Sequence, residues 1–161
     1  MATNKILIIA PAWVGDMVMA QALFKLLKQR EPTVTIDVLA LPWAQSLLAR
    51  MPEVNNVLTM PLGHGQLQLQ QRWQLGRSLR AEAYQQAIVL PNSWKSALVP
   101  FAARIPQRTG WLGELRFGLL NDARRLDKNQ LPLMVQRFLA LGVSFPHKQE
   151  TKILEPDIIN H

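Results

Sequence analysis

An apolar run that stops at a turn and leads into a helical pattern constrains the fold of this chain more than any other feature. The run at residues 6–10, Ile-Leu-Ile-Ile-Ala, has no polar alternation, which is typical of a strand covered on both faces in a parallel α/β sheet. Pro11 and Gly15 then interrupt the pattern, and apolar side chains recur at helical spacing over residues 17–30. The sequence therefore predicts a first β-turn-α unit.

The same order of strand and helix recurs along the chain at intervals of roughly 25 to 30 residues. Further strands are predicted at residues 33–41, 54–60, 87–90 and 106–111, and helices at 42–48, 66–80, 97–104 and 131–141. Residues 113–127 are interpreted as a long basic loop, and residues 143–161 show no strong pattern. This order predicts an α/β fold with a Rossmann-like, doubly wound parallel sheet.

Polar residues follow several of the predicted strands, where ligands of such sheets bind. The expected members of this carboxyl edge are Asp16, His64, Asn92, Lys95, Glu114 and Arg116. Asp16 also has a structural interpretation, because acidic residues stabilise the first turn of a helix. For Ser93, helix capping is the simpler interpretation. Arg72, Arg77 and Arg80 are interpreted as a solvated face of the helix at 66–80.

The formal net charge of +7 is concentrated in the middle of the chain. Residues 1–60 carry +1, residues 61–128 carry +6 and residues 129–161 carry no net charge. Such an excess attracts phosphate or carboxylate ligands, nucleic acid or an anionic membrane surface, and charge alone does not choose among them. The chain has no cysteine and only three histidines, far apart in sequence, so neither a disulfide nor a metal site is expected. The glycine-rich signatures of dinucleotide and P-loop sites are absent.

Several motifs occur in the order found in one enzyme family, at residues 11–19, 51–54, 61–65, 90–97, 108–111 and 118–122. Through them, residues 4–142 resemble the N-terminal half of bacterial ADP-heptose:lipopolysaccharide heptosyltransferases of type II. The resemblance implies an inverting, metal-independent transferase of the GT-B type, with two Rossmann-like domains. Residues 1–142 would be the acceptor-binding domain, and 143–161 a tail or the start of an interdomain linker. The donor-binding half, where ADP-heptose would mainly bind, is expected to be absent from this chain.

The resemblance also implies roles for individual residues. Asp16 would be the general base that takes a proton from the acceptor hydroxyl, for which it must lie within hydrogen-bonding reach. Arginine and lysine side chains would contact the anionic acceptor, the inner core of lipopolysaccharide, and tryptophans, including Trp94, would stack on its sugars. The expected acceptor-binding residues are Trp13, Gly15, Asn92, Lys95, Trp111, Glu114, Arg116, Arg124 and Arg125.

The resemblance further implies a cytoplasmic protein, peripheral at the inner membrane, that needs no cofactor beyond the sugar nucleotide and is inactive without its donor half. Two other functions fit the basic charge. A nucleic-acid or nucleotide-binding module is disfavoured, because the cations are scattered and form no RNA-binding motif. A non-catalytic protein of the membrane surface would bind anionic lipid without a specific glycan.

Overall fold

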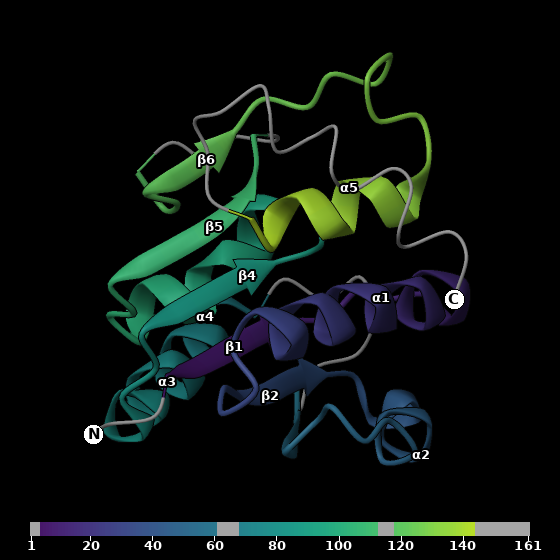
Figure 1. The fold of residues 1–161 in the computed structure, drawn as a ribbon. Coiled ribbons are helices and arrows are strands. Elements are labelled where there is room, and N and C mark those ends of the chain that lie inside the picture. The colour runs from purple at the N-terminus through teal and green to yellow at the C-terminus, as the bar shows by residue number, and fades with distance from the viewer. Residues whose placement is uncertain (1–3, 61–67, 113–117, 144–161) are drawn as a thin grey trace.

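A computed structural model describes residues 4–60, 68–112 and 118–143, which form a six-stranded, entirely parallel sheet (Figure 1). The strand order is β3-β2-β1-β4-β5-β6. This order reverses direction between β1 and β4, as in doubly wound sheets with a Rossmann-like topology. The strands are β1 (Lys5–Ile9), β2 (Thr35–Ala40), β3 (Asn56–Thr59), β4 (Gln86–Val89), β5 (Gln107–Trp111) and β6 (Asp122–Arg124).

Helices cover both faces of the sheet. They are α1 (Val14–Arg30), α2 (Gln45–Leu48), α3 (Leu69–Leu79), α4 (Leu98–Ala102) and α5 (Met134–Leu141), with the 3-10 segments η1 (Pro42–Ala44), η2 (Arg80–Glu82) and η3 (Trp94–Ala97). Successive side chains of a strand point to opposite faces. Accordingly, Ile6 and Ile8 pack in the core beneath α1 and α5, whereas Leu7 and Ile9 pack in the core beneath α3 and α4. The buried run at residues 6–9 thus contributes to both cores.

One glycine permits the close approach of α3 to α4. A Cβ atom placed on Gly76 would lie 2.5 Å from Cβ of Ala102 and 2.6 Å from the carbonyl oxygen of Val99. Both neighbours belong to α4, so a larger side chain at position 76 would have to push the two helices apart. The close packing of α3 against α4 therefore depends on a glycine at this position.

The structure confirms the predicted α/β class, the doubly wound parallel sheet and the five predicted strands, with ends that differ by at most two residues. The interpretation of residues 113–127 as one long loop is wrong, because β6 pairs with β5 inside it. A polar strand of three residues at a sheet edge has no hydrophobic pattern by which a sequence could reveal it. The predictions for residues 61–65, 113–117 and 144–161 lie outside the described residues.

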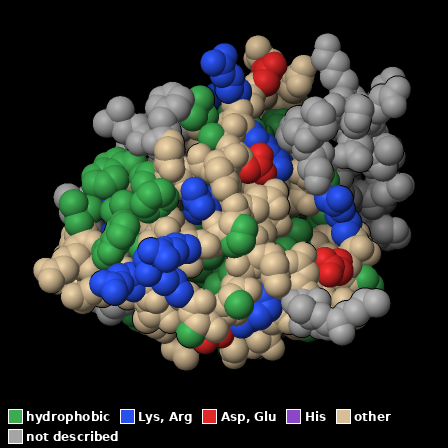
Figure 2. Space-filling view, turned by 90° about the vertical axis from the view of Figure 1, so that its left-hand side faces the viewer, with side chains coloured by type: hydrophobic (Ala, Val, Ile, Leu, Met, Phe, Trp, Pro, Cys, Tyr) green, Lys and Arg blue, Asp and Glu red, His purple; other side chains and the backbone are tan. Residues whose placement is uncertain are grey.

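The length of the helices and the exposed hydrophobic side chains both bear on the relation of the protein to a membrane. Within the described ranges, no helix is long and apolar enough to cross a lipid bilayer. Exposed hydrophobic side chains gather on the side of the molecule that carries α3 and α4, and Lys and Arg side chains border them (Figure 2).

Candidate active site at the carboxyl edge of the sheet

A pocket of about 280 Å³ lies at the carboxyl ends of β1, β2 and β4. The turns that follow β1 and β4 both line it, so it lies at the point where the strand order reverses. Ligands of doubly wound sheets bind in this crevice. The lining residues are Ile9, Ala10, Pro11, Ala12, Leu39, Ala40, Leu41, Met60, Arg72, Pro91, Ser93, Lys95 and Ser96.

The turn after β1 leads directly from the pocket into α1. Trp13 has extended backbone angles and precedes the helix, which starts at Val14, so Asp16 lies in the first turn. Its side chain is half-buried and lies near the positive end of the helix dipole, which favours a carboxylate. Gly15 is exposed, and a Cβ atom placed on it would meet no described atom within 4 Å. The backbone beside Asp16 is therefore open to a close approach.

The turn after β4 is held by Ser96. Its Oγ donates a hydrogen bond of 2.5 Å to the carbonyl oxygen of Ser93 and a longer one of 3.5 Å to that of Pro91. Ser93 occupies the N-cap position of η3, but its side chain makes no capping hydrogen bond. The interpretation of Ser93 as a helix cap is therefore only partly correct. Asn92, in the same turn, is exposed.

Two cations line the pocket, and one of them corrects an expectation from sequence. Arg72 is only 7% exposed and reaches the pocket from α3, so it does not belong to a solvated helix face. Burial lowers the pKa of Arg72, but an arginine in a protein stays protonated. Lys95 is half-buried on the opposite side. Arg72 and Lys95 give the described lining two positive charges, which suit the pocket to an anionic group.

The sequence contains a signal that could have identified Arg72. Arg72, Gly76 and Leu79 are separated by four and three residues, so they share one face of α3, and all three are buried. A helix face that combines an arginine with a glycine and a leucine is turned toward the protein. Arg72 lies on this inward face and lines the pocket at the carboxyl edge of the sheet.

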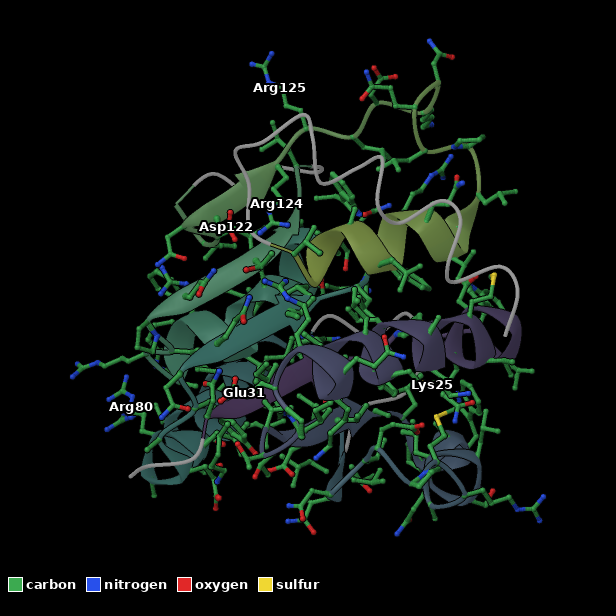
Figure 3. The ribbon with its side chains drawn as sticks, in the orientation of Figure 1. Lys25, Glu31, Arg80, Asp122, Arg124 and Arg125 are labelled. Atoms are coloured by element: carbon green, nitrogen blue, oxygen red, sulfur yellow. The ribbon has the colours of Figure 1, made fainter. Side chains whose placement is uncertain are left out.

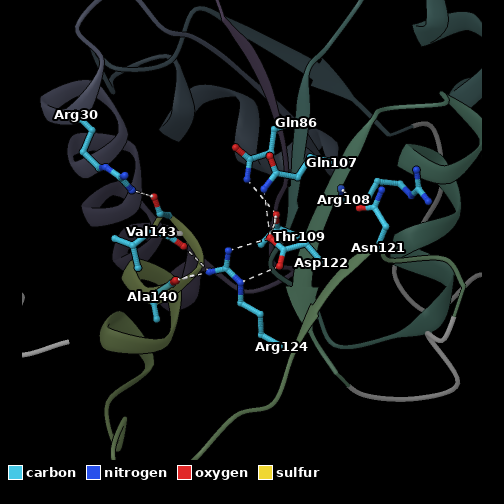
Figure 4. Close-up of polar contacts among 11 residues, drawn as sticks. Arg30, Gln86, Gln107, Arg108, Thr109, Asn121, Asp122, Arg124, Ala140 and Val143 are labelled. Atoms are coloured by element: carbon cyan, nitrogen blue, oxygen red, sulfur yellow. Dashed lines mark hydrogen bonds and ion pairs between the residues drawn. The ribbon is translucent and has the colours of Figure 1, made fainter. Parts of the chain in front are cut away.

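Arg124 does not lie at this pocket, contrary to the expectation that it contacts the acceptor there. It is buried, and its Nη2 lies 2.9 Å from Oδ2 of Asp122 (Figures 3 and 4). Its Nη1 donates hydrogen bonds of 2.7 Å to the carbonyl oxygens of Ala140 and Val143. The guanidinium therefore ties the edge strand β6 to the end of α5.

Asp122 and its neighbours complete this cluster at the opposite, amino-terminal side of the sheet. Asp122 accepts hydrogen bonds from Thr109 Oγ1 at 2.8 Å and from Gln107 Nε2 at 3.3 Å. Burial raises the pKa of Asp122, but the hydrogen bonds from Arg124 and Thr109 and the charge of Arg124 outweigh this effect and hold the pKa below its ordinary value. Gln107 and Arg124 line a second, more polar pocket of about 230 Å³ together with Asn4 and Gln86.

The remaining predicted site residues are dispersed. Trp111 is buried in the core beneath α1 and α5, so the structure makes it a packing residue and not a stacking surface. Trp13 is 65% exposed next to the pocket turn, and Arg125 is exposed and points away from the sheet (Figure 3). His64, Glu114 and Arg116 lie outside the described residues. Among the described residues, no group of three or more His, Cys, Asp or Glu side chains could hold a metal ion.

Comparison with known proteins identifies the family. Residues 72–155 match the description "Glycosyltransferase family 9 (heptosyltransferase)". This chain belongs to glycosyltransferase family 9. The family-9 chain is 61% identical over 138 residues to lipopolysaccharide heptosyltransferase 2 of Salmonella typhimurium, and 54% identical over 153 residues to lipooligosaccharide heptosyltransferase 2 of Haemophilus ducreyi.

Solved structures agree with this assignment. The E. coli ADP-heptose lps heptosyltransferase II superposes with a TM-score of 0.85 at 50% identity, over 96% of this chain and 44% of that one. A family 9 glycosyltransferase from Veillonella parvula, 14% identical, superposes with a TM-score of 0.73 over 86% of this chain and 40% of its own length, and shows the shared fold. The family-9 chain spans 40% of the Salmonella relative and 42% of the Haemophilus one, while those matches cover 86% and 95% of this chain.

Proposed function

We propose that this chain supplies the acceptor-binding half of a heptosyltransferase, which transfers heptose from ADP-heptose to the inner core of lipopolysaccharide. The observation that carries the proposal is the pocket at the reversal point of the sheet, with Arg72 and Lys95 in its lining and Asp16 in the adjoining helix turn. The names of the similar proteins support the choice of sugar and acceptor. The donor would bind mainly to a second domain that faces this edge.

In the proposed reaction, the carboxylate of Asp16 accepts the proton of an acceptor hydroxyl. The hydroxyl oxygen forms a bond to the anomeric carbon of the donor heptose, and the bond from that carbon to the diphosphate breaks, so that ADP leaves with the electron pair. Attack on the face opposite the leaving group inverts the anomeric configuration. General base catalysis of this kind requires the carboxylate to lie within about 3 Å of the hydroxyl. The proposal includes no metal ion and no cofactor beyond the sugar nucleotide.

Arg72 and Lys95 are proposed to hold anionic groups of the acceptor. Guanidinium and ammonium groups make charge-assisted hydrogen bonds to phosphate and carboxylate, and partial burial strengthens them because water screens them less. Trp13, Gly15 and Asn92, which border the pocket, are proposed as neutral acceptor contacts. The protein is proposed to act in the cytoplasm, peripherally at the inner membrane, where such a glycolipid would be presented.

Calorimetry with two ligands tests this function. The chain is titrated with ADP-heptose and with a soluble, heptosylated inner-core oligosaccharide at 50 and 200 mM salt. Acceptor binding that weakens with salt, without donor binding, is expected from an isolated acceptor half. Binding of ADP-heptose alone would show that the chain is the donor-binding half and that the acceptor-half proposal is wrong. Failure of both ligands, with tight and salt-dependent binding to RNA instead, would replace the transferase proposal by a nucleic-acid function.

A further inference from the structure

The outer surface of α3 and α4 is an exposed aromatic face. Its members are the exposed Leu69, Trp73 and Phe101 and the half-buried Trp94 and Leu98, and a shallow hollow of about 530 Å³ lies among most of them. The rings of Trp73 and Phe101 lie 6.0 Å apart, so the two helices present one continuous surface. Trp73 is 41% exposed, which leaves a large apolar area in contact with solvent. Figure 2 shows hydrophobic side chains gathered on this side of the molecule.

This face is built by the sequence of α3 and is separate from the side that packs on the protein. Leu69, Trp73 and Arg77 follow one another at spacings of four residues, so they form one stripe along α3, and Arg80 follows in η2. The buried residues of α3 form a different stripe, which packs inward. Apart from the contact of Trp73 with Phe101 and the hydrogen bond of 2.8 Å from Arg80 Nε to the carbonyl oxygen of Ala102, this stripe is turned away from the cores of the domain.

Arginines border the aromatic face. Arg77 and Arg104 are exposed, and Arg80 is half-buried and donates a hydrogen bond of 2.8 Å from Nε to the carbonyl oxygen of Ala102 at the end of α4. The guanidinium of Arg108 lies over the ring of Phe101, 5.4 Å from its centre. Residues 68–108 carry six Lys or Arg and a single acid, Glu82. The face therefore combines aromatic rings with charge of one sign.

We infer that this aromatic–arginine face docks on the surface of an anionic lipid bilayer. Tryptophan is favoured at the boundary between lipid tails and headgroups, and each arginine near an anionic surface adds to the electrostatic attraction. A protein partner would require an acidic surface to match this excess of positive charge, whereas anionic headgroups supply negative charge over any area. The inference rests on the proposed function only in that the acceptor would be carried by the membrane.

Docking through this face would bring the pocket to the membrane. Trp73 directly follows Arg72, which lines the pocket from α3, and Trp94 directly precedes Lys95, which lines it from the other side. The aromatic face and the cationic pocket are thus formed by neighbouring residues of the same two segments, α3 and η3. A glycolipid whose lipid part stays in the bilayer could reach the pocket with its sugars without leaving the membrane.

Vesicle binding tests this inference, with controls that the chain itself offers. Trp73→Gln and Arg77→Gln are compared with Trp43→Gln and Arg50→Gln, which alter exposed residues of η1 and of the turn after α2. Trp43 is 39% exposed, close to the value for Trp73. Sedimentation with vesicles of phosphatidylcholine and phosphatidylglycerol, 3:1, and with pure phosphatidylcholine, gives the affinities. Circular dichroism establishes that each variant is folded.

The expected result is binding to the anionic vesicles that falls at least about fivefold in Trp73→Gln and in Arg77→Gln, and is unchanged in both controls. Absence of vesicle binding, or equal losses in the controls, would overturn the inference. A dimer of the unaltered chain that Trp73→Gln dissociates, without vesicle binding, would assign the face to a second copy of the chain instead.

The same variants separate this inference from the proposed function. Trp73→Gln is expected to keep the affinity for the soluble inner-core oligosaccharide, because that ligand has no lipid. Vesicle binding without oligosaccharide binding would refute the acceptor proposal and leave the docking face standing. Oligosaccharide binding without vesicle binding would refute the docking face and leave the acceptor proposal standing.

Discussion

The two ends of the sheet use their charged residues in different ways. At the amino-terminal side, the ion pair of Arg124 with Asp122 is completed by Thr109 and by carbonyl oxygens of the α5 end. At the carboxyl side, Arg72 and Lys95 line a pocket whose described lining has no carboxylate. The first cluster joins elements of the fold, and the second places two cations in the lining of a pocket. Stability and binding are therefore separated to opposite ends of one sheet.

This difference shows why a positive charge is a poor guide to function by itself. Burial does not distinguish the two arginines, because Arg72 and Arg124 are both less than a tenth exposed. They differ in their surroundings, since a carboxylate stands 2.9 Å from Arg124 and Arg72 faces a pocket. Four substitutions test the separation, from the largest expected effect to the smallest.

Asp16→Asn is expected to have the largest effect, on catalysis. In a protein that joins this chain to a donor-binding half, the loss of the base should lower kcat by about 10²- to 10⁴-fold. The midpoint of urea unfolding should move little, because a first-turn acid contributes only about 0.3 to 1 kcal/mol to helix stability. Near-normal turnover would remove Asp16 from the mechanism, and a collapse of stability would show that the carboxyl edge is structural as well.

Arg124→Ala is expected to have the largest effect on stability. It leaves the partly buried carboxylate of Asp122 without its ion-pair partner and frees two carbonyl oxygens, at a cost of roughly 2 to 3 kcal/mol in the free energy of unfolding. Urea denaturation measures this cost. Arg125→Ala, which removes the exposed neighbour, should change the unfolding free energy by less than about 0.5 kcal/mol.

The cost of Arg124→Ala should depend on pH with a defined sign. The pKa of Asp122 is lower in the folded chain than its ordinary value of about 3.9, so the folded state favours the charged form. The stabilisation is present above the ordinary pKa and is lost as the pH falls through the lower, folded-state pKa. The difference between the unaltered chain and the variant should therefore be full at pH 6 and shrink below pH 4. A difference that is constant with pH would refute this account of the cluster.

Gly76→Ala tests the close contact between α3 and α4. The added methyl group would lie 2.5 Å from Cβ of Ala102, and the separation of the helices should cost about 1 to 3 kcal/mol. Because α3 carries Arg72, acceptor affinity should fall as well, and calorimetry measures this effect. Gly15→Ala is the stability control, since a methyl group there meets no described atom, and no loss of stability is expected. Unchanged stability of Gly76→Ala would mean that the helices can separate without cost.

Lys95→Gln is expected to have the smallest effect and to be confined to binding. The loss of one charge from the pocket should weaken acceptor binding by about five- to tenfold, which corresponds to about 1 to 1.4 kcal/mol. The unfolding free energy should change by less than about 0.5 kcal/mol. Lys25→Gln, on the exposed side of α1, is the matched control and should bind as the unaltered chain does (Figure 3). An equal loss in both would indicate attraction by net charge only.

The sequence by itself was sufficient for the architecture. Buried strands such as the run at residues 6–9 carry their signal locally, because a strand covered on both faces must be continuously apolar. Strands separated by helices then leave a doubly wound parallel sheet as the natural arrangement. The position of Asp16 after the first strand was equally readable, since it depends on chain order alone.

The tertiary structure decided which cations and aromatics could take part in a site. Arg124 meets Ala140 and Val143 across 16 and 19 residues of sequence, and Trp111 is buried by helices at both ends of the chain. Local periodicity carries no information on such partners, and a short polar strand like β6 has no pattern of its own. Secondary structure follows from the order of apolar and polar residues, whereas the role of a charge follows from what the fold brings beside it.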